Sequence, residues 1–105
     1  MSTDFSSQAT PIPQAPFNQP VTVGDKFVNL TASALIKSGQ GWLAGIFVNS
    51  GSAPTVKLWN NTSAAGAVIC NTFTPVTGWN PCPIPFTTGL YATLGGTIDA
   101  TFVFV

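Results

Sequence analysis

The strongest constraint on this chain is an uncharged apolar run over residues 42–50, with the sequence WLAGIFVNS. The run is too short and too rich in aromatic and β-branched residues for a helix, so we expect a β-strand. Both sets of alternate positions are largely apolar, which predicts a central strand that is covered on both faces of its sheet. Gly45 in the middle indicates a β-bulge, or another group packed close against the backbone.

The rest of residues 22–105 carries similar signals, because short apolar or alternating runs are separated by turn residues and no helical period occurs. This pattern predicts an all-β domain: an antiparallel β-sandwich of about eight strands, with a jelly-roll-like arrangement. The sequence leaves the strand order open. The expected strands are residues 27–31, 32–37, 42–50, 55–59, 67–74, 79–88, 89–94 and 97–105.

Glycine and proline add detail to these strands. Residues 51–54 predict a turn that closes the central strand, and Gly95-Gly96 predicts a tight hairpin turn between the last two strands. Prolines at three alternate positions of residues 79–88 remove backbone donors, so this segment should be an edge strand or an extended loop. The chain closes on Phe-Val-Phe-Val, an end that we expect to be locked in the sheet or in a subunit contact.

Residues 1–21 form a separate zone in which Gln, Ala, Ser and Thr are interrupted by prolines. This density of proline blocks both helix and central strand, and favours an extended or polyproline conformation. Phe5, Ile12 and Phe17 are isolated apolar residues within it. Two interpretations stay open: a flexible tail, or an arm that lies along a neighbouring subunit and docks these side chains. We therefore divide the chain into an N-terminal arm, residues 1–21, and a β-sandwich domain, residues 22–105.

Charge is scarce along the whole chain. Only 6% of the residues are charged, against about 25% in an average protein, and the net charge is zero. Little repulsion would keep copies apart, so we expect part of the surface to be covered by other protein. The alternative is an ordinary β domain with a Thr, Ser and Asn surface. Three scattered lysines cannot supply the clustered cations that phosphate contacts need, which argues against a nucleic-acid partner.

The start of the chain lacks the basic and apolar regions of a signal peptide, and no run approaches the length of a membrane span. We therefore expect synthesis in the cytoplasm and no membrane partner. Cys70 and Cys82 are then expected to be free thiols that pack as small hydrophobic side chains. A disulfide between them stays open if their strands pair.

The inventory of reactive side chains argues against an enzyme. The chain has no His and no Glu, so Ser–His and Cys–His pairs are impossible. Asp25 and Asp99, which fall in the expected domain, are interpreted as turn and surface residues and not as a catalytic carboxylate pair. Clustered ligands for zinc or calcium are missing as well. We predict no catalytic residue, no metal site and no cofactor.

The aromatic residues leave a carbohydrate-binding function open. Sandwich lectins stack such side chains on sugars, and asparagines near them could bind sugar hydroxyls. The alternative is that these residues belong to the core or to an interface. The residues in question are Trp42, Trp59, Trp79 and Tyr91, with Asn60, Asn61 and Asn80.

Three blocks of the sequence resemble small virion proteins of tailed bacteriophages. They are TASALIKSGQGWLAGIFV at residues 31–48, TVKLWNN at residues 55–61 and LYATLGGTIDAT at residues 90–101. The resemblance covers roughly residues 31–105 and excludes the proline-rich arm. It implies a phage structural protein, in particular a capsid decoration or cement protein, and no catalytic residue. Such proteins are often trimers that sit where major capsid subunits meet.

We therefore expect a homotrimer on the capsid surface of the virion, made in the host cytoplasm and bound to the phage major capsid protein. Low charge would make such contacts insensitive to salt, and many copies would bind together strongly. A tail or fibre component of the virion and a carbohydrate-binding β-sandwich module are the alternatives. The candidate interface residues are Phe5, Ile12, Phe17, Trp42, Trp59, Trp79, Phe102 and Phe104.

Overall fold

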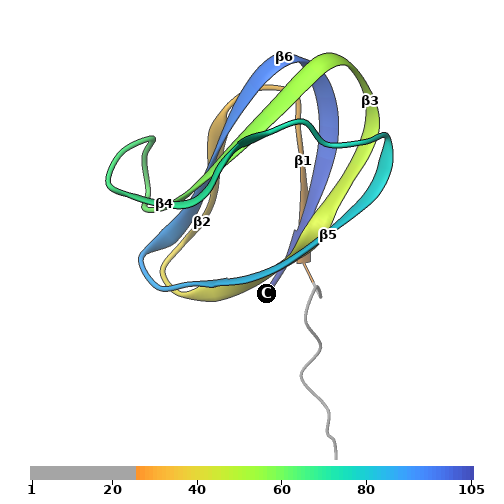
Figure 1. Cartoon of the computed structure of the whole chain (residues 1–105). Coiled ribbons are helices and arrows are strands. Elements are labelled where there is room, and N and C mark those ends of the chain that lie inside the picture. Colours follow the sequence, from red (N-terminus) through yellow and green to blue (C-terminus); the bar gives the residue numbers. More distant parts are fainter. Residues whose placement is uncertain (1–25) are drawn as a thin grey trace, which may run out of the picture.

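The computed structural model describes residues 26–105, which form one antiparallel β-sheet of six strands and no helix (Figure 1). The predicted all-β class is confirmed. Residues 1–25, with the expected arm and its side chains Phe5, Ile12 and Phe17, lie outside the described residues. No helix in the described part could cross a membrane. The strands are β1 Lys26–Leu30, β2 Ala34–Ser38, β3 Gly41–Asn60, β4 Ala67–Phe73, β5 Gly78–Phe86 and β6 Gly89–Phe104.

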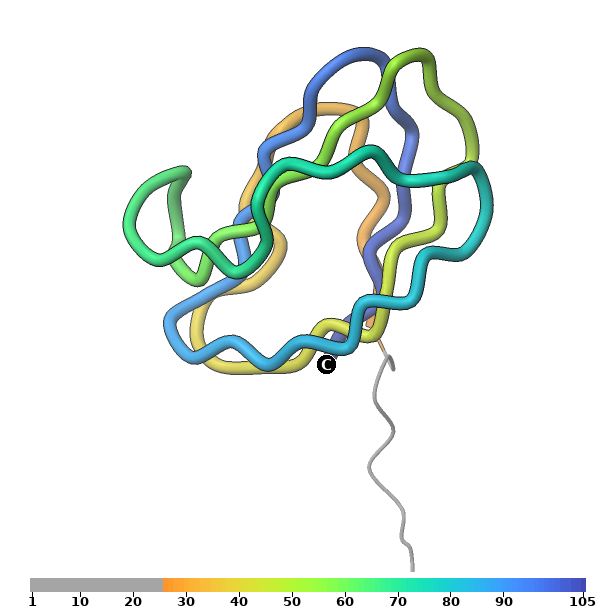
Figure 2. The backbone as a smooth tube through the Cα atoms, viewed as in Figure 1, coloured from red at the N-terminus to blue at the C-terminus, as the bar shows by residue number. Residues whose placement is uncertain are grey.

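The two long strands β3 and β6 pair with each other along most of their length, from Leu43 opposite Phe104 to Trp59 opposite Tyr91. On its other side, each of these two strands pairs with one strand along one half of its length and with a different strand along the other half. At one end the strand order is β1–β6–β3–β5, and at the other end it is β2–β6–β3–β4. Figures 1 and 2 show β3 and β6 arching together between these two ends.

The count of strands differs from the expected eight because two expected turns lie inside continuous strands. Residues 51–54 belong to β3 and Gly95-Gly96 to β6, so the predicted hairpin at the glycine pair is wrong. Ala53 and Gly96 have positive φ angles of 48° and 68°, and the register shifts between residues 52 and 55. Because a β-carbon at Gly96 would meet the Ala53 backbone, glycine lets the two strands bend together there.

A bulge sets the faces of β3. Leu43, Ile46 and Val48 are all buried, although an uninterrupted strand would place Leu43 opposite the other two. Both ladders that flank this part of β3 shift register between Leu43 and Gly45. The bulge expected at Gly45 is therefore confirmed, and the extra residue brings Leu43 to the inner face.

The central position of residues 42–50 is confirmed, since this part of β3 lies between β5 and β6. The prediction that both of its faces are covered is wrong, because Trp42 and Phe47 are exposed on the outer face. At the chain end, the backbone N–H of Val105 donates to the Trp42 carbonyl at 2.9 Å, and the Trp42 N–H donates to the Val105 carbonyl at 3.3 Å. This end is thus locked in the sheet, as its apolar sequence predicts.

One cluster of buried side chains forms the core, and both halves of β3 and β6 contribute to it. Phe102 is 0% exposed and Phe104 is 8% exposed, so these two expected interface residues belong to the core instead. Alternation along β6 turns them inward together with Ile98 and Ala100. The buried residues are Leu43, Ile46, Val48, Val56, Leu58, Phe86, Leu90, Ala92, Ile98, Ala100, Phe102 and Phe104.

The proline-containing strand β5 pairs only with β3 in the described part, which confirms the expected edge strand. Its exposure alternates, with Pro81, Pro83 and Pro85 outward and Cys82 turned toward the core. Cys82 and Cys70 are both free, half-buried thiols packed against the core cluster.

Candidate interaction face

Four large aromatic side chains are exposed on the outer surface of the β1–β6–β3–β5 end, and we call them the aromatic face. Phe27 of β1 is 76% exposed, Trp42 and Phe47 of β3 are 37% and 44% exposed, and Trp79 of β5 is 46% exposed. Residues directly opposite in antiparallel strands point to the same side of a sheet. Phe47 of β3 lies opposite Trp79 of β5. Phe27 of β1 lies opposite Val103 of β6, which in turn lies opposite Gly45 of β3. Side chains of β1, β3 and β5 therefore share one surface.

The bulge in β3 is what gathers Trp42 and Phe47. Their positions differ by five, so an uninterrupted strand would point them to opposite faces of the sheet. The register shift between Leu43 and Gly45 reverses the alternation between them. Both aromatic side chains therefore face outward, while the core side chains of the same strand face inward.

Trp79 covers the bulge from the edge strand. A β-carbon at Gly45 would lie 2.6 Å from Cη2 and Cζ2 of the indole, so glycine makes the close approach possible. The turn that precedes β5 is held by Asn80, whose Oδ1 accepts from the Val76 N–H at 2.9 Å. Its Nδ2 donates to the carbonyls of Val76 at 2.9 Å and Ile46 at 3.2 Å. Asn80 thus fixes the segment that carries Trp79, instead of offering its amide to a ligand.

A hydrogen-bonded carboxylate lies at one end of the aromatic face. Asp99 Oδ1 accepts from Asn29 Nδ2 at 2.7 Å and from Asn49 Nδ2 at 3.2 Å. Asn29 Nδ2 also lies 3.2 Å from Thr101 Oγ1, to which it donates. Asp99 is the one carboxylate side chain of residues 26–105, and it is occupied by amide donors. The four aromatic side chains of the face are uncharged, and the carboxylate of Asp99 lies at its end.

The other end of the sheet has an outer surface of a different character, which we call the Trp59 row. Leu35, Tyr91, Trp59 and Val68 lie opposite one another across β2, β6, β3 and β4. Lys57 Nζ lies 4.4 Å from the centroid of the Trp59 ring, and Trp59 Nε1 donates to Thr93 Oγ1 at 2.9 Å. The indole of Trp59 is thus held by a hydrogen bond and by a lysine of its own chain.

The asparagines considered for sugar binding hold loops in place. Asn60 Oδ1 accepts from the N–H groups of Thr87 at 3.0 Å and Thr88 at 2.9 Å. Asn61 Nδ2 donates to the Ala65 carbonyl at 2.8 Å. With Asn80 also occupied, these three amides bind backbone groups of the chain itself.

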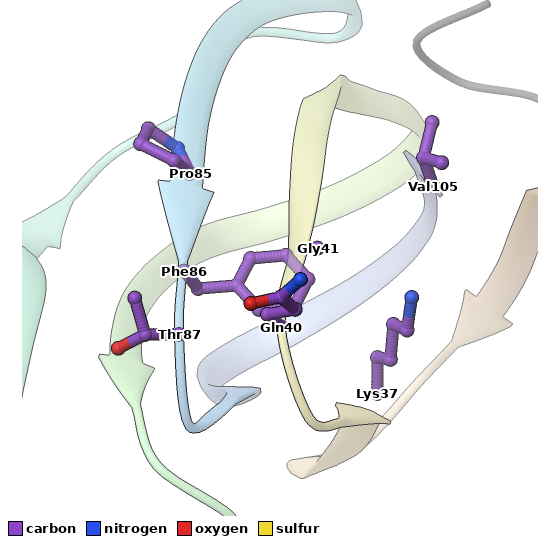
Figure 3. Close-up of a pocket in the computed structure, with 7 residues that line it drawn as sticks. All are labelled: Lys37, Gln40, Gly41, Pro85, Phe86, Thr87 and Val105. Atoms are coloured by element: carbon purple, nitrogen blue, oxygen red, sulfur yellow. The ribbon is translucent and has the colours of Figure 1, made fainter. Parts of the chain in front are cut away.

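An open hollow lies beside the turn between β2 and β3 (Figure 3). Lys37 and Val105 stand on one side of the Phe86 ring, with Pro85 and Thr87 on the other. Its polar side chains are Lys37, Gln40 and Thr87, of which only Lys37 is charged. No group of three or more His, Cys, Asp or Glu side chains that could hold a metal ion occurs in residues 26–105.

Comparison of the chain with protein-family models, with curated proteins and with solved structures gave no match.

The structure brings together only some of the expected interface residues. Trp42 and Trp79 lie on the aromatic face, whereas Trp59 lies at the other end of the sheet. Phe27 and Phe47 were missed. Phe27 could have been found from its alternation with the half-buried Val28, but the outward position of Phe47 depends on the bulge.

Proposed function

We propose that the bent sheet is a jelly-roll sandwich of eight strand segments, in which β3 and β6 each contribute one segment to each of two layers. One layer would be β1–β6–β3–β5 and the other β2–β6–β3–β4. The shared core cluster supports this arrangement, because buried residues from both halves of β3 and β6 belong to it. The bend at Ala53 and Gly96 would form the corner between the layers.

We propose that the chain is a structural protein of a bacteriophage virion, a capsid decoration protein without enzymatic activity or cofactor. The aromatic face carries this proposal. Exposed apolar patches of this kind mark interaction sites on soluble proteins, and aromatic side chains dominate the binding energy of protein interfaces. The resemblance to phage virion proteins gives the proposal its setting.

In the proposed mechanism, the protein binds the head surface as a homotrimer and bridges neighbouring major capsid subunits. Burial of the aromatic face between neighbouring copies would hold the trimer together, since each large aromatic side chain buries a large apolar area. Contacts without charge lose little strength in salt. Repetition over the capsid lattice would make modest single contacts effective.

Co-sedimentation of the purified chain with heads that lack it tests this proposal. We expect saturable binding to heads and none to isolated tails. Phe47→Ser should weaken head binding at least about tenfold, because a well-packed interface aromatic residue contributes that much. Val76→Ser, a change at a more exposed apolar residue outside the aromatic face, is the control and should bind normally. Binding to tails alone would instead support a tail or fibre component.

A carbohydrate-binding module is the second candidate, and the Trp59 row is the observation that favours it. Tyr91 and Trp59 lie side by side on adjacent strands, with Lys57 and Thr93 next to them. Such a platform could stack on sugar rings. Titration with host-surface glycans while tryptophan fluorescence is recorded would reveal such binding. Loss of the fluorescence change in Trp59→Phe would assign the binding to the Trp59 row. The decoration proposal expects no fluorescence change.

A further inference from the structure

We infer that the aromatic face of one copy binds the proline-rich segment of a second copy, through residues 11–17 with the sequence PIPQAPF. This contact concerns the assembly of the chain itself, and would hold on whichever surface the protein decorates. It joins two features of one sequence: a sheet face with four exposed aromatic side chains, and a proline-rich apolar segment outside that sheet.

The chemistry of the two partners is complementary. Proline-rich segments dock on aromatic surfaces because proline rings pack flat on aromatic rings, and because their extended conformation loses little entropy on binding. Residues 11–17 hold three prolines, Ile12 and Phe17 and no charge. The aromatic face offers Trp42, Phe47 and Trp79, so most of the contact would join apolar groups on both sides and remove no ion from water.

The point at which the segment joins the sheet lies beside the aromatic face. Residues 1–25 join the sheet at Lys26, and the next residue, Phe27, is already part of the aromatic face. Lys26 lies opposite Phe104, and Phe104 lies opposite Leu43, the neighbour of Trp42. The segment therefore departs from the end of the face that carries Trp42.

The scarcity of charge over the whole chain favours contact between copies, and the lengths allow the segment of one copy to reach the face of a second. From Trp42 to Phe47 the face extends about 17 Å along β3. Residues 11–17 in a polyproline conformation would cover about 19 Å, which matches this length. The connection from Phe17 to Lys26 could span about 28 Å, enough to cross the edge of one domain and reach the next. If each copy gives one segment and receives one, the contact closes into a symmetric oligomer.

Mixing two full-length variants tests this contact. The segment variant carries Ile12→Ser and Phe17→Ser, and the face variant carries Phe27→Ser and Phe47→Ser. The control carries Val68→Ser and Val76→Ser, two exposed residues outside the aromatic face. Sedimentation velocity measures association, and circular dichroism shows that each variant keeps its β-structure. If the double face variant loses that structure, Phe27→Ser alone replaces it, because Phe27 is the most exposed residue of the face.

We expect each variant alone to associate at least about tenfold more weakly than the original chain, and the control to associate normally. An equimolar mixture should form a heterodimer, because the segment variant still offers an intact face and the face variant an intact segment. Normal association of the segment variant would overturn the inference and indicate that two faces meet directly. A monomeric original chain, or a mixture that stays monomeric, would overturn it as well. Head binding is measured separately, so its failure leaves this result intact.

Discussion

The indole of Trp79 lies directly over the backbone of Gly45, so close that a β-carbon at residue 45 would come within 2.6 Å of two ring carbons. The contact joins the edge strand β5 to the bulge of β3. It also determines how the aromatic face is built, because the same bulge turns Trp42 and Phe47 outward.

Gly45→Ala should therefore destabilise the domain, since the added methyl group must displace Trp79 or the nearby Asn80 carbonyl. We expect a loss of about 1–3 kcal/mol in the free energy of unfolding, measured with urea. In a Trp79→Ala background the cost should shrink, because only the carbonyl remains in the way. Equal costs in both backgrounds would contradict the contact.

Phe102→Ala should be among the most destabilising single changes, at about 3–5 kcal/mol, because it leaves a cavity at a fully buried position between β1 and β3. Val76→Ala is the control, and should cost less than about 0.5 kcal/mol at its exposed site. Urea unfolding of both variants gives the comparison. A small loss at Phe102 would contradict its place in the core and reopen it as an interface residue.

Burial raises the pKa of the Cys82 thiol above its ordinary value, and the neighbouring Cys70 raises it further. The unfolded chain therefore releases this proton at a lower pH than the folded chain. The stabilising contribution is complete below the ordinary thiol pKa, about 8.5, and is lost as the pH rises beyond it. We expect urea stability to fall between pH 8 and 10 more steeply in the original chain than in Cys82→Ala. Parallel profiles would show that Cys82 does not titrate in this way.

Deletion of residues 1–20 should leave a folded domain, because every strand and every core residue described lies beyond them. The circular dichroism spectrum and the unfolding transition of the domain itself should persist. Decoration of heads should be poor, since the proline-rich segment no longer reaches its partner. Normal decoration by the truncated chain would refute the role of the segment.

Much of the architecture could be predicted from local sequence. Alternation identified the segments that form strands, and the prolines of β5 identified an edge because proline lacks the N–H that a second neighbour needs. The prediction of turns failed where glycine can serve either a tight turn or a bend within a strand. Gly95-Gly96 is typical of a hairpin, but here Gly96 lets a long strand bend against Ala53, a tertiary contact that no local pattern contains.

The candidate site was harder to predict because one inserted residue decides it. Gly45 indicated a bulge, yet the sequence did not show that the bulge would reverse the faces of β3 and expose both Trp42 and Phe47. Phe102 and Phe104 show the opposite error. Their position at the end of an apolar strand favoured an interface, but both belong to the buried core cluster.

The most direct test of the central claim, that the aromatic face is a surface for protein contact, is the native mass of the full chain by light scattering at low ionic strength and at about 1 M salt. The aromatic side chains of the face carry no charge, so we predict an oligomer at both ionic strengths, with three times the mass of one chain. Phe27→Ser should reduce this mass, and Val76→Ser should not. A monomer at both ionic strengths, up to the highest protein concentration measured, would contradict the account.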